Sequence, residues 1–166
     1  EGVPLPEELK KHEAVCRKIK VWPGDTVAEK ELTLTEHLTP TGWFDPDAWF
    51  RSKLDVLNIN GPKATTIDWK TGKRRPEFMQ HEFAALQIFT HNPEIEVVDA
   101  AFVWLKEDSK VDRETYERDK HYEPIKKKLL EKTERIQEAL ELEVWPARPS
   151  GLCAYCPAKS FCEYVR

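Results

Sequence analysis

Short runs of alternating hydrophobic and polar residues recur along the chain and predict β-strands. In the first run, Leu32 and Leu34 fall on one side and Thr33 on the other, which is the period of two expected of a strand. Turn-forming residues at 60–62 (Asn-Gly-Pro) separate the next two runs and predict a hairpin. Strands are expected at about residues 26–35, 49–59, 64–69 and 96–105.

Hydrophobic residues at helical spacing predict three helices between and after these strands. Pro23-Gly24 and Asn92-Pro93 end the first two helices, and residues 36–47, with two prolines and a glycine, predict a loop. Helices are expected at residues 5–20, 76–91 and 112–143. This order of elements predicts an α/β fold with a mixed central sheet flanked by helices, followed by a Cys-rich C-terminal tail.

The composition is typical of a globular domain. The chain has 166 residues, of which 40% are hydrophobic and 34% charged, so it can bury a core. We expect residues 1–166 to form a single domain, with a core at about 26–105 and a helical and cysteine-bearing extension at about 112–166. No apolar run reaches the ~20 residues that span a bilayer, and no signal-peptide pattern is present. We therefore expect a cytoplasmic protein without membrane contact.

The formal net charge of −4 excludes a protein that binds nucleic acid through overall charge alone. Two local basic runs are present, at residues 70–75 and 126–128. The second run is typical of a solvated helix face. The first run directly follows the candidate catalytic residues described next.

A carboxylate and a lysine two residues apart form the sharpest local feature. Asp68 and Lys70 belong to a predicted strand, whose period of two directs both side chains to the same face. Asp55 belongs to the partner strand of the hairpin, and antiparallel pairing can bring it beside Asp68. The alternative is that Asp68 and Lys70 are ordinary exposed residues of an edge strand, because an Asp-x-Lys pair alone is common.

Two neighbouring carboxylates repel each other unless a cation lies between them. Oxygen ligands of this kind suit Mg²⁺ or Mn²⁺. Such a metal would polarise a phosphodiester and activate a water, and Lys70 would orient or deprotonate that water or neutralise the transition state. The cluster therefore predicts a metal-dependent phosphodiester hydrolase.

Three segments together resemble the RecB-type branch of the PD-(D/E)xK nucleases. They are residues 51–57 (RSKLDVL), residues 67–73 (IDWKTGK) and Gln80. The resemblance runs from about Glu29 to Cys162, and its members include phage-encoded exonucleases and CRISPR-associated adaptation nucleases. It implies a restriction-endonuclease-like core.

The resemblance also implies roles for individual residues. Asp55, Asp68 and the backbone carbonyl of Trp69 would bind the metal. Lys70 would be the catalytic lysine, and Gln80 would be a further catalytic residue that opens the helix bordering the site. The basic residues after the motif are candidates for DNA contact: Lys73, Arg74 and Arg75.

The chain departs from the family pattern at two positions. Ser52 replaces the usual glycine before the first aspartate, and Ala84 replaces the aromatic residue of the glutamine motif. Gln87 lies on the same helical stripe as Gln80 and is a second candidate, unless this stripe is simply the solvent face. His12, on the first predicted helix, is a candidate for the metal-binding histidine that many relatives carry upstream. The other histidines considered are expected at the surface: His37, His81 and His121.

Three C-terminal cysteines have the spacing C-x₂-C-x₅-C, which is typical of zinc and iron–sulfur sites. They are Cys153, Cys156 and Cys162, and Cys16 brings the number to four. RecB-type relatives often hold a [4Fe–4S] cluster with one distant N-terminal cysteine and three C-terminal ones. The resemblance therefore favours a [4Fe–4S] cluster over zinc, with Cys16 as the fourth ligand. Alternatively, Cys16 is a buried helix thiol.

These observations predict a Mg²⁺- or Mn²⁺-dependent DNA exonuclease that acts on DNA ends or single strands in recombination, repair or phage DNA processing. If phage-encoded, it would work in the host cytoplasm. Two alternatives stay open. The first is a catalytically weak or inactive nuclease-like DNA-binding module, and the second is a subunit that needs a helicase, recombinase or integrase partner. A homo-oligomer is also compatible with the sequence.

Overall fold

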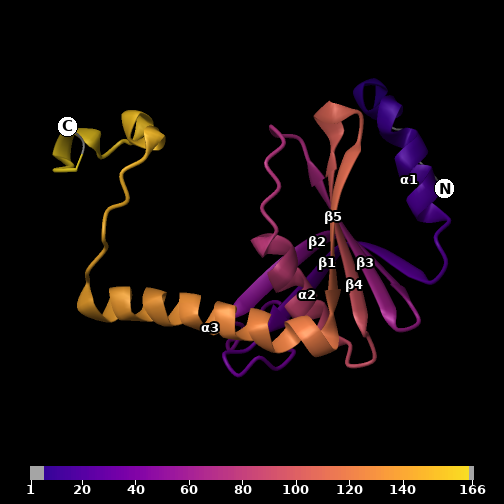
Figure 1. Cartoon of the computed structure of the whole chain (residues 1–166), viewed down its shortest axis with the longest axis horizontal. Helices are drawn as coiled ribbons and strands as arrows, with labels where there is room; N and C mark the ends of the chain where they lie inside the picture. Colours follow the sequence, from indigo (N-terminus) through magenta and orange to yellow (C-terminus); the bar gives the residue numbers. More distant parts are fainter. Residues whose placement is uncertain (1–5, 165–166) are drawn as a thin grey trace. The chain divides into compact units, whose positions relative to one another are not determined.

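A five-stranded mixed sheet forms the centre of the computed structural model, which describes residues 6–164 (Figure 1). The strands are β1 (Asp25–Leu34), β2 (Phe50–Asn60), β3 (Lys63–Lys70), β4 (Val97–Trp104) and β5 (Lys110–Glu117). They lie side by side in the order β1-β2-β3-β4-β5, and all neighbours are antiparallel except β3 and β4. The predicted α/β fold with a mixed sheet is confirmed.

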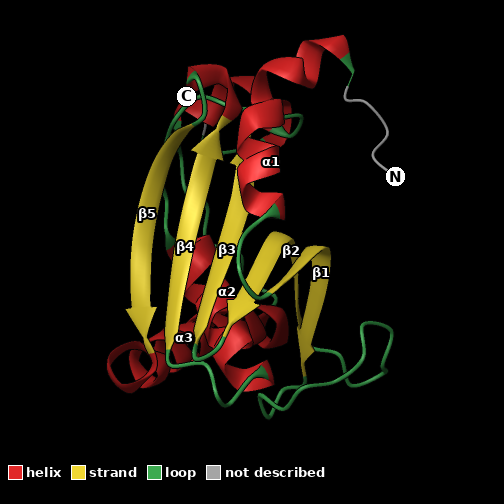
Figure 2. Cartoon of the chain, turned by 90° about the vertical axis from the view of Figure 1, so that its right-hand side faces the viewer, coloured by secondary structure: helices red, strands yellow, loops and turns green. Residues whose placement is uncertain are grey.

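Helices α1 (Glu13–Lys20) and α2 (Met79–His91) lie on opposite faces of this sheet. The other helices are η1 (Glu7–His12), η2 (Leu105–Glu107), α3 (Arg118–Leu142), η3 (Gly151–Tyr155) and η4 (Lys159–Phe161). Helix α1 covers one face, where Ile19 packs against residues of β2, β3 and β4, and α2 lies behind the other face (Figure 2). Because β3 and β4 are parallel, the chain must cross over between them, and α2 is that crossover.

The residues after β3 explain where α2 begins. The prediction placed the helix start at Pro76, whereas residues 71–78 are irregular up to Phe78 and α2 starts at Met79. Within this segment, Nε of Arg74 donates to Oδ2 of Asp112 on β5 at 2.9 Å. Nη2 of Arg74 also contacts Oδ1 of the same carboxylate. This ion pair holds the segment after β3 to β5, and α2 begins only after it, at Met79.

The strand β5 was missed by the sequence analysis. Residues 112–117 were predicted as the start of a long helix, but residues 110–117 pair with β4 along their whole length. Charged residues dominate this strand, and only Tyr116 is buried. Charges on an edge strand hinder pairing with other chains, and they also hide the alternation on which strand prediction depends. The remaining helix, α3, continues through Pro124, where an interruption had been considered.

The polar stripe of α2 is exposed at Gln80 but faces the core at Ala84 and Gln87. Gln87 is completely buried, and its amide nitrogen donates to the carbonyls of Leu32 at 3.3 Å and Phe50 at 3.0 Å. His91 contacts the backbone of Thr33 at 2.9 Å. The solvent-face interpretation is therefore wrong for Gln87. This residue instead joins the helix to β1 and β2.

Arg118 fastens the end of α2 to the start of α3. Its guanidinium donates to three backbone carbonyls, those of Phe89, Asn92 and Ile95, at 2.7–2.8 Å. The Arg118→Met variant leaves these carbonyls without their donor, so we expect the free energy of unfolding to fall by about 2–4 kcal/mol. Urea denaturation measures this loss. Arg113→Met on the exposed edge strand is the control and should cost less than about 0.5 kcal/mol; equal losses would contradict this account of Arg118.

The chain divides into two compact units, residues 1–128 and residues 129–166. The first unit holds the sheet, α1, α2 and the start of α3. The second holds the rest of α3 and the short helices η3 and η4. No helix within residues 6–164 is both long and apolar enough to cross a membrane.

Candidate active site

The register of the β2–β3 hairpin brings the two predicted carboxylates together. Val56 pairs with Ile67, so Asp55 and Asp68 are the next residues on the two strands and lie opposite each other. Their side chains point away from the face covered by α1, where Val56 and Ile67 pack. The backbone N–H of Trp69 donates to Oδ2 of Asp55 at 2.8 Å and fixes the orientation of this carboxylate.

Asp68, Lys70 and Gln80 form a closed ring of polar contacts. Nζ of Lys70 lies 2.7 Å from Oδ2 of Asp68 and donates to Oε1 of Gln80 at 3.0 Å. The amide nitrogen of Gln80 donates in turn to Oδ1 of Asp68 at 2.7 Å. The structure therefore brings together all four residues predicted as catalytic, from β2, β3 and the first turn of α2.

The electrostatics of Asp55 differ from those of an exposed aspartate. Partial burial raises the pKa of Asp55, the Trp69 N–H opposes this, and the negative charges of Asp68 and Glu29 add to the rise. Glu29 lies on β1 between Ala28 and Lys30, whose partners Val56 and Leu54 flank Asp55 on β2. Its carboxylate pairs with Lys53 at 3.1 Å. Without a cation, the ionised form of Asp55 is thus less favoured than that of an exposed aspartate.

His81 is a member of this site that the sequence analysis placed at the surface. It is only 2% exposed, and its ring stacks on Phe102 with the ring centres 3.8 Å apart. Burial lowers the pKa of His81 to about 4, so its ring is neutral at pH 7. The signal for its burial was in the sequence, because His81 has helical spacing with the buried residues Ala84 and Ile88.

Two hollows adjoin the carboxylates. A pocket of about 150 Å³ lies between β2, β3 and α2, and its lining includes Asp55, Asp68, Gln80 and His81. A second hollow of about 320 Å³ lies on the other side of Lys70 and Gln80, and Arg75 lines it. The reacting groups are therefore reachable from a surface that carries a basic residue.

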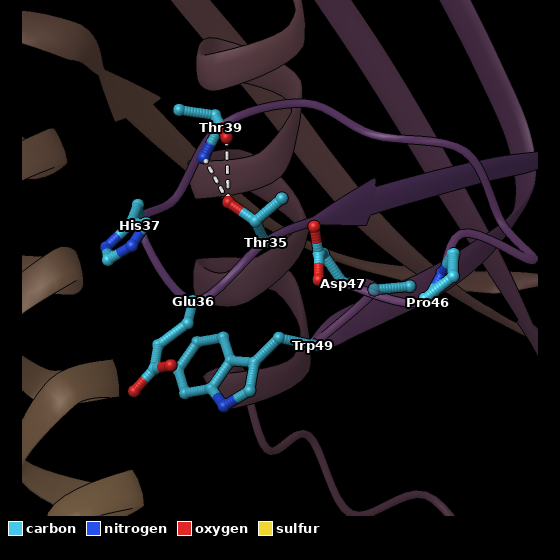
Figure 3. Close-up of a pocket in the computed structure, with 8 residues that line it drawn as sticks. Thr35, Glu36, His37, Thr39, Pro46, Asp47 and Trp49 are labelled. Carbon is cyan, nitrogen blue, oxygen red and sulfur yellow. Dashed lines mark hydrogen bonds between the residues drawn. The ribbon is translucent and has the colours of Figure 1, made fainter.

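A more spacious pocket lies elsewhere, in the loop between β1 and β2 (Figure 3). It measures about 550 Å³. Figure 3 shows its two carboxylates, those of Glu36 and Asp47, pointing apart, and Thr39 bonds to Oγ1 of Thr35. Its lining has no lysine or arginine to face a phosphate. Size alone does not make this pocket the reaction centre.

A family model described as the PD-(D/E)XK nuclease superfamily matches residues 5–163. The chain belongs to the PD-(D/E)XK nuclease superfamily. Among solved structures, one entitled "Crystal structure of SSO0001" shares 13% identity over 96% of this chain and 68% of that chain, with a TM-score of 0.44. No curated protein matches the sequence.

Membership in this superfamily accounts for the fold and for the class of reaction. The mixed sheet with helices on both faces is the restriction-endonuclease-like architecture that the sequence predicted. The superfamily implies nuclease activity on DNA, and its members typically use Mg²⁺ or Mn²⁺.

The residues of the site fit a hard divalent cation. Mg²⁺ is usually bound by one or two carboxylates and completed by water and substrate phosphate. Asp55 and Asp68 supply two carboxylates, and the buried Oδ2 of Asp68 is in contact only with the Lys70 ammonium, at 2.7 Å, among the described residues. Within residues 6–164, no three His, Cys, Asp or Glu side chains converge closely enough to form a metal site by themselves. A cation here would depend on water and phosphate for its remaining ligands.

The predicted DNA-contact residues differ from one another in their surroundings. Lys73 is exposed, and Arg75 lines the hollow beside Lys70. Arg74 is already paired with Asp112, which also accepts a hydrogen bond from the Trp104 indole at 2.7 Å. Arg74 therefore anchors the segment after β3, and the other two residues are available to a substrate.

The structure does not bring His12 into the carboxylate pocket. His12 ends η1, is buried, and its Nδ1 lies 3.2 Å from the hydroxyl of Ser109 between β4 and β5. The residues lining the pocket do not include it. Ala84, at the position of the family's aromatic residue, does line the pocket and leaves space there.

The four cysteines are all free thiols. Cys16 is exposed on α1, so the alternative of a buried helix thiol is wrong. Cys153 is half-buried in η3, and its sulfur accepts a hydrogen bond from the backbone of Ser150 at 3.2 Å. Cys156 is exposed and Cys162 is half-buried.

Proposed function

We propose that the chain is a Mg²⁺- or Mn²⁺-dependent DNA exonuclease of the RecB type, acting on DNA ends or single strands. One observation carries this proposal. Asp55 and Asp68 lie opposite each other on adjacent strands, with the ammonium of Lys70 2.7 Å from Asp68. The pairing of two carboxylates and a lysine suits phosphodiester hydrolysis, and the family places that chemistry on DNA.

In this proposal each side chain has one task. Asp55, Asp68 and the Trp69 carbonyl hold the cation, which when bound polarises the phosphate and acidifies water. Lys70 lies beside the nucleophile and stabilises the charge that develops on the phosphate. Gln80 contacts both Lys70 and Asp68 and therefore keeps the lysine beside the carboxylate.

Substrates with and without ends test the exonuclease assignment. End-labelled linear DNA, single- and double-stranded, is incubated with Mg²⁺ or Mn²⁺ beside circular DNA of the same sequence. We expect linear DNA to be degraded from its ends and circular DNA to stay intact. Cleavage of circles would make the chain an endonuclease of the same superfamily.

Lys73 and Arg75 are proposed to contact the phosphate backbone. The Lys73→Ala/Arg75→Ala variant should bind DNA more weakly than the wild type. The slope of a plot of log binding constant against log salt concentration should also be smaller in magnitude by about 1–2. Fluorescence anisotropy across a salt series measures both changes. The matched control, Lys126→Ala/Lys127→Ala, alters the basic run that we interpret as a solvated helix face and should bind like the wild type. An unchanged salt slope in the first variant would remove these residues from the interface.

We further propose that residues 1–166 act as one nuclease domain whose extension carries a [4Fe–4S] cluster on Cys16, Cys153, Cys156 and Cys162. The spacing of the last three cysteines supports this. Protein purified without oxygen should contain about four irons and four sulfides per chain. The Cys156→Ser variant should lose them. Bound zinc in place of iron would support the Cys₄ zinc alternative, and neither metal would refute both.

A partner-dependent nuclease is the second candidate. The net charge of −4 and the pairing of Arg74 with Asp112 both reduce the attraction of the isolated chain for DNA. A helicase, recombinase or integrase subunit would then deliver the strand. Cleavage that appears only when such a partner is added, by wild type but not by a Lys70 variant, would support this candidate over the independent exonuclease.

A further inference from the structure

His81 has the most unusual environment of the side chains around the pocket. It is 2% exposed, yet neither Nδ1 nor Nε2 has a hydrogen-bond partner among the described residues. Buried polar groups are paired in the great majority of cases, since an unpaired one is unfavourable. A phenylalanine or leucine would fill the same space without this loss. The unpaired ring nitrogens therefore indicate that His81 has a role beyond packing.

The surroundings of the ring restrict what that function can be. Phe102 stacks on it at 3.8 Å and Phe78 lies 5.9 Å away, so one side of the ring is apolar. The charged groups that act on it are those of Asp68 and Lys70. His81 lines the 150 Å³ pocket together with Asp55 and Asp68, and the polar partner of its ring must lie in that pocket.

A second buried polar atom lies in the same pocket and has room for a hydrogen-bond donor. Oδ2 of Asp68 is buried and accepts no hydrogen bond from the described residues, although it is close to the Lys70 ammonium. A neutral imidazole offers one donor and one acceptor, and a carboxylate oxygen offers only acceptors. A water molecule held between them can accept from the ring N–H and donate to Asp68.

We propose that His81 is a positioning residue of the nuclease centre, which holds Asp68 through a bridging water in the orientation that binds the metal. The inference rests on the proposed function and adds a residue to it. His81 is not assigned as a ligand, because it does not converge with two other acidic, His or Cys side chains of residues 6–164. Replacing a residue that holds a metal ligand in this way typically lowers metal affinity or activity by 10–100-fold.

The His81→Phe variant tests this proposal, because it keeps the stacked ring and removes both nitrogens. We expect its Mn²⁺ affinity, measured by calorimetry, to be about 10–100-fold weaker than that of the wild type. The melting temperature of the metal-free variant should be equal or higher, because two unpaired buried groups are gone. A purely structural histidine would not move these two readouts in opposite directions. Should His81→Phe fail to fold, His81→Leu carries the same expectation.

His91→Phe is the matched control on the same helix. His91 has a backbone partner, Thr33, and does not line the pocket. Its replacement should lower the melting temperature and leave the Mn²⁺ affinity unchanged. Wild-type Mn²⁺ affinity in folded His81→Phe would overturn the inference. A wild type whose Mn²⁺ affinity depends on His81 but which cleaves no DNA would instead overturn the proposed nuclease activity and leave the role of His81 standing.

Discussion

Lys70→Ala is expected to lower the rate of metal-dependent DNA cleavage by about 10²–10⁴-fold, the usual contribution of a positioned proton-transfer or charge-stabilising group. The Lys70 ammonium is the one positive group in direct contact with both Asp68 and Gln80 among the described residues. Without it, nothing beside the carboxylates can orient the nucleophile or neutralise the phosphate. Mn²⁺ should bind equally well or more tightly, because a competing cation has been removed from Asp68.

The control for this variant comes from the same strand. Lys63 lies at the other end of β3 and is also paired with an aspartate, Asp99, at 2.6 Å. Lys63→Ala removes a lysine of similar surroundings from a place remote from the pocket, so cleavage should stay at the wild-type rate. Single-turnover rates with saturating Mn²⁺ compare the two variants. Equal rates for wild type and Lys70→Ala would remove Lys70 from the mechanism.

Asp55→Asn is expected to slow catalysis strongly while making the metal-free protein more stable. The cleavage rate should fall by about 10²–10³-fold, the range for loss of one electrostatic stabiliser. The amide oxygen can still accept the Trp69 N–H, so the hairpin is preserved. Removing the carboxylate ends its repulsion with Asp68 and Glu29. In the wild type, metal should raise the melting temperature, and in the variant this rise should largely disappear.

The stability difference between Asp55→Asn and the wild type should depend on pH in one direction. A carboxyl group whose pKa is raised by folding favours the folded state when it is protonated, and this advantage is lost as the pH rises through the raised pKa. The pKa of Asp55 is raised from its ordinary 3.8. The stability advantage of Asp55→Asn over wild type should therefore be small at low pH and grow towards neutrality.

Asp99→Asn provides a control of opposite sign. Burial alone would raise the pKa of Asp99, but hydrogen bonds from Lys63 and Thr115 outweigh it and lower that pKa. Its replacement should therefore destabilise the protein at neutral pH. Thermal melts from acid to neutral pH, with and without Mn²⁺, distinguish the two aspartates. Metal stabilisation of Asp55→Asn equal to that of wild type would contradict the assignment of Asp55 as a ligand.

The reacting groups could be predicted from sequence because they depend on local periodicity. The Asn-Gly-Pro turn sets the register of the β2–β3 hairpin, and this register places Asp55 opposite Asp68. The period of two then places Lys70 on the same face. Gln80 came from the family resemblance, and the structure brings it within 3.0 Å of Lys70.

Features that depend on long-range packing were not predicted. The strand β5 gains its stability from β4, and its charged residues gave no local strand signal. His81 was expected at the surface, whereas the crossover helix carries it against Phe102 on β4. The pairing of Arg74 with Asp112 joins residues 38 positions apart and removes one of three candidate DNA contacts. Each of these outcomes depends on how the sheet brings distant segments together.

The most direct test of the nuclease assignment is hydrolysis of labelled DNA by the purified wild-type chain, in Mg²⁺ or Mn²⁺ and in EDTA, with Lys70→Ala in parallel. The account predicts degradation that requires the metal and is lost in the variant. Folded protein with its cysteine site filled that leaves DNA intact in both metals, or a Lys70→Ala variant that cleaves as fast as wild type, would contradict it.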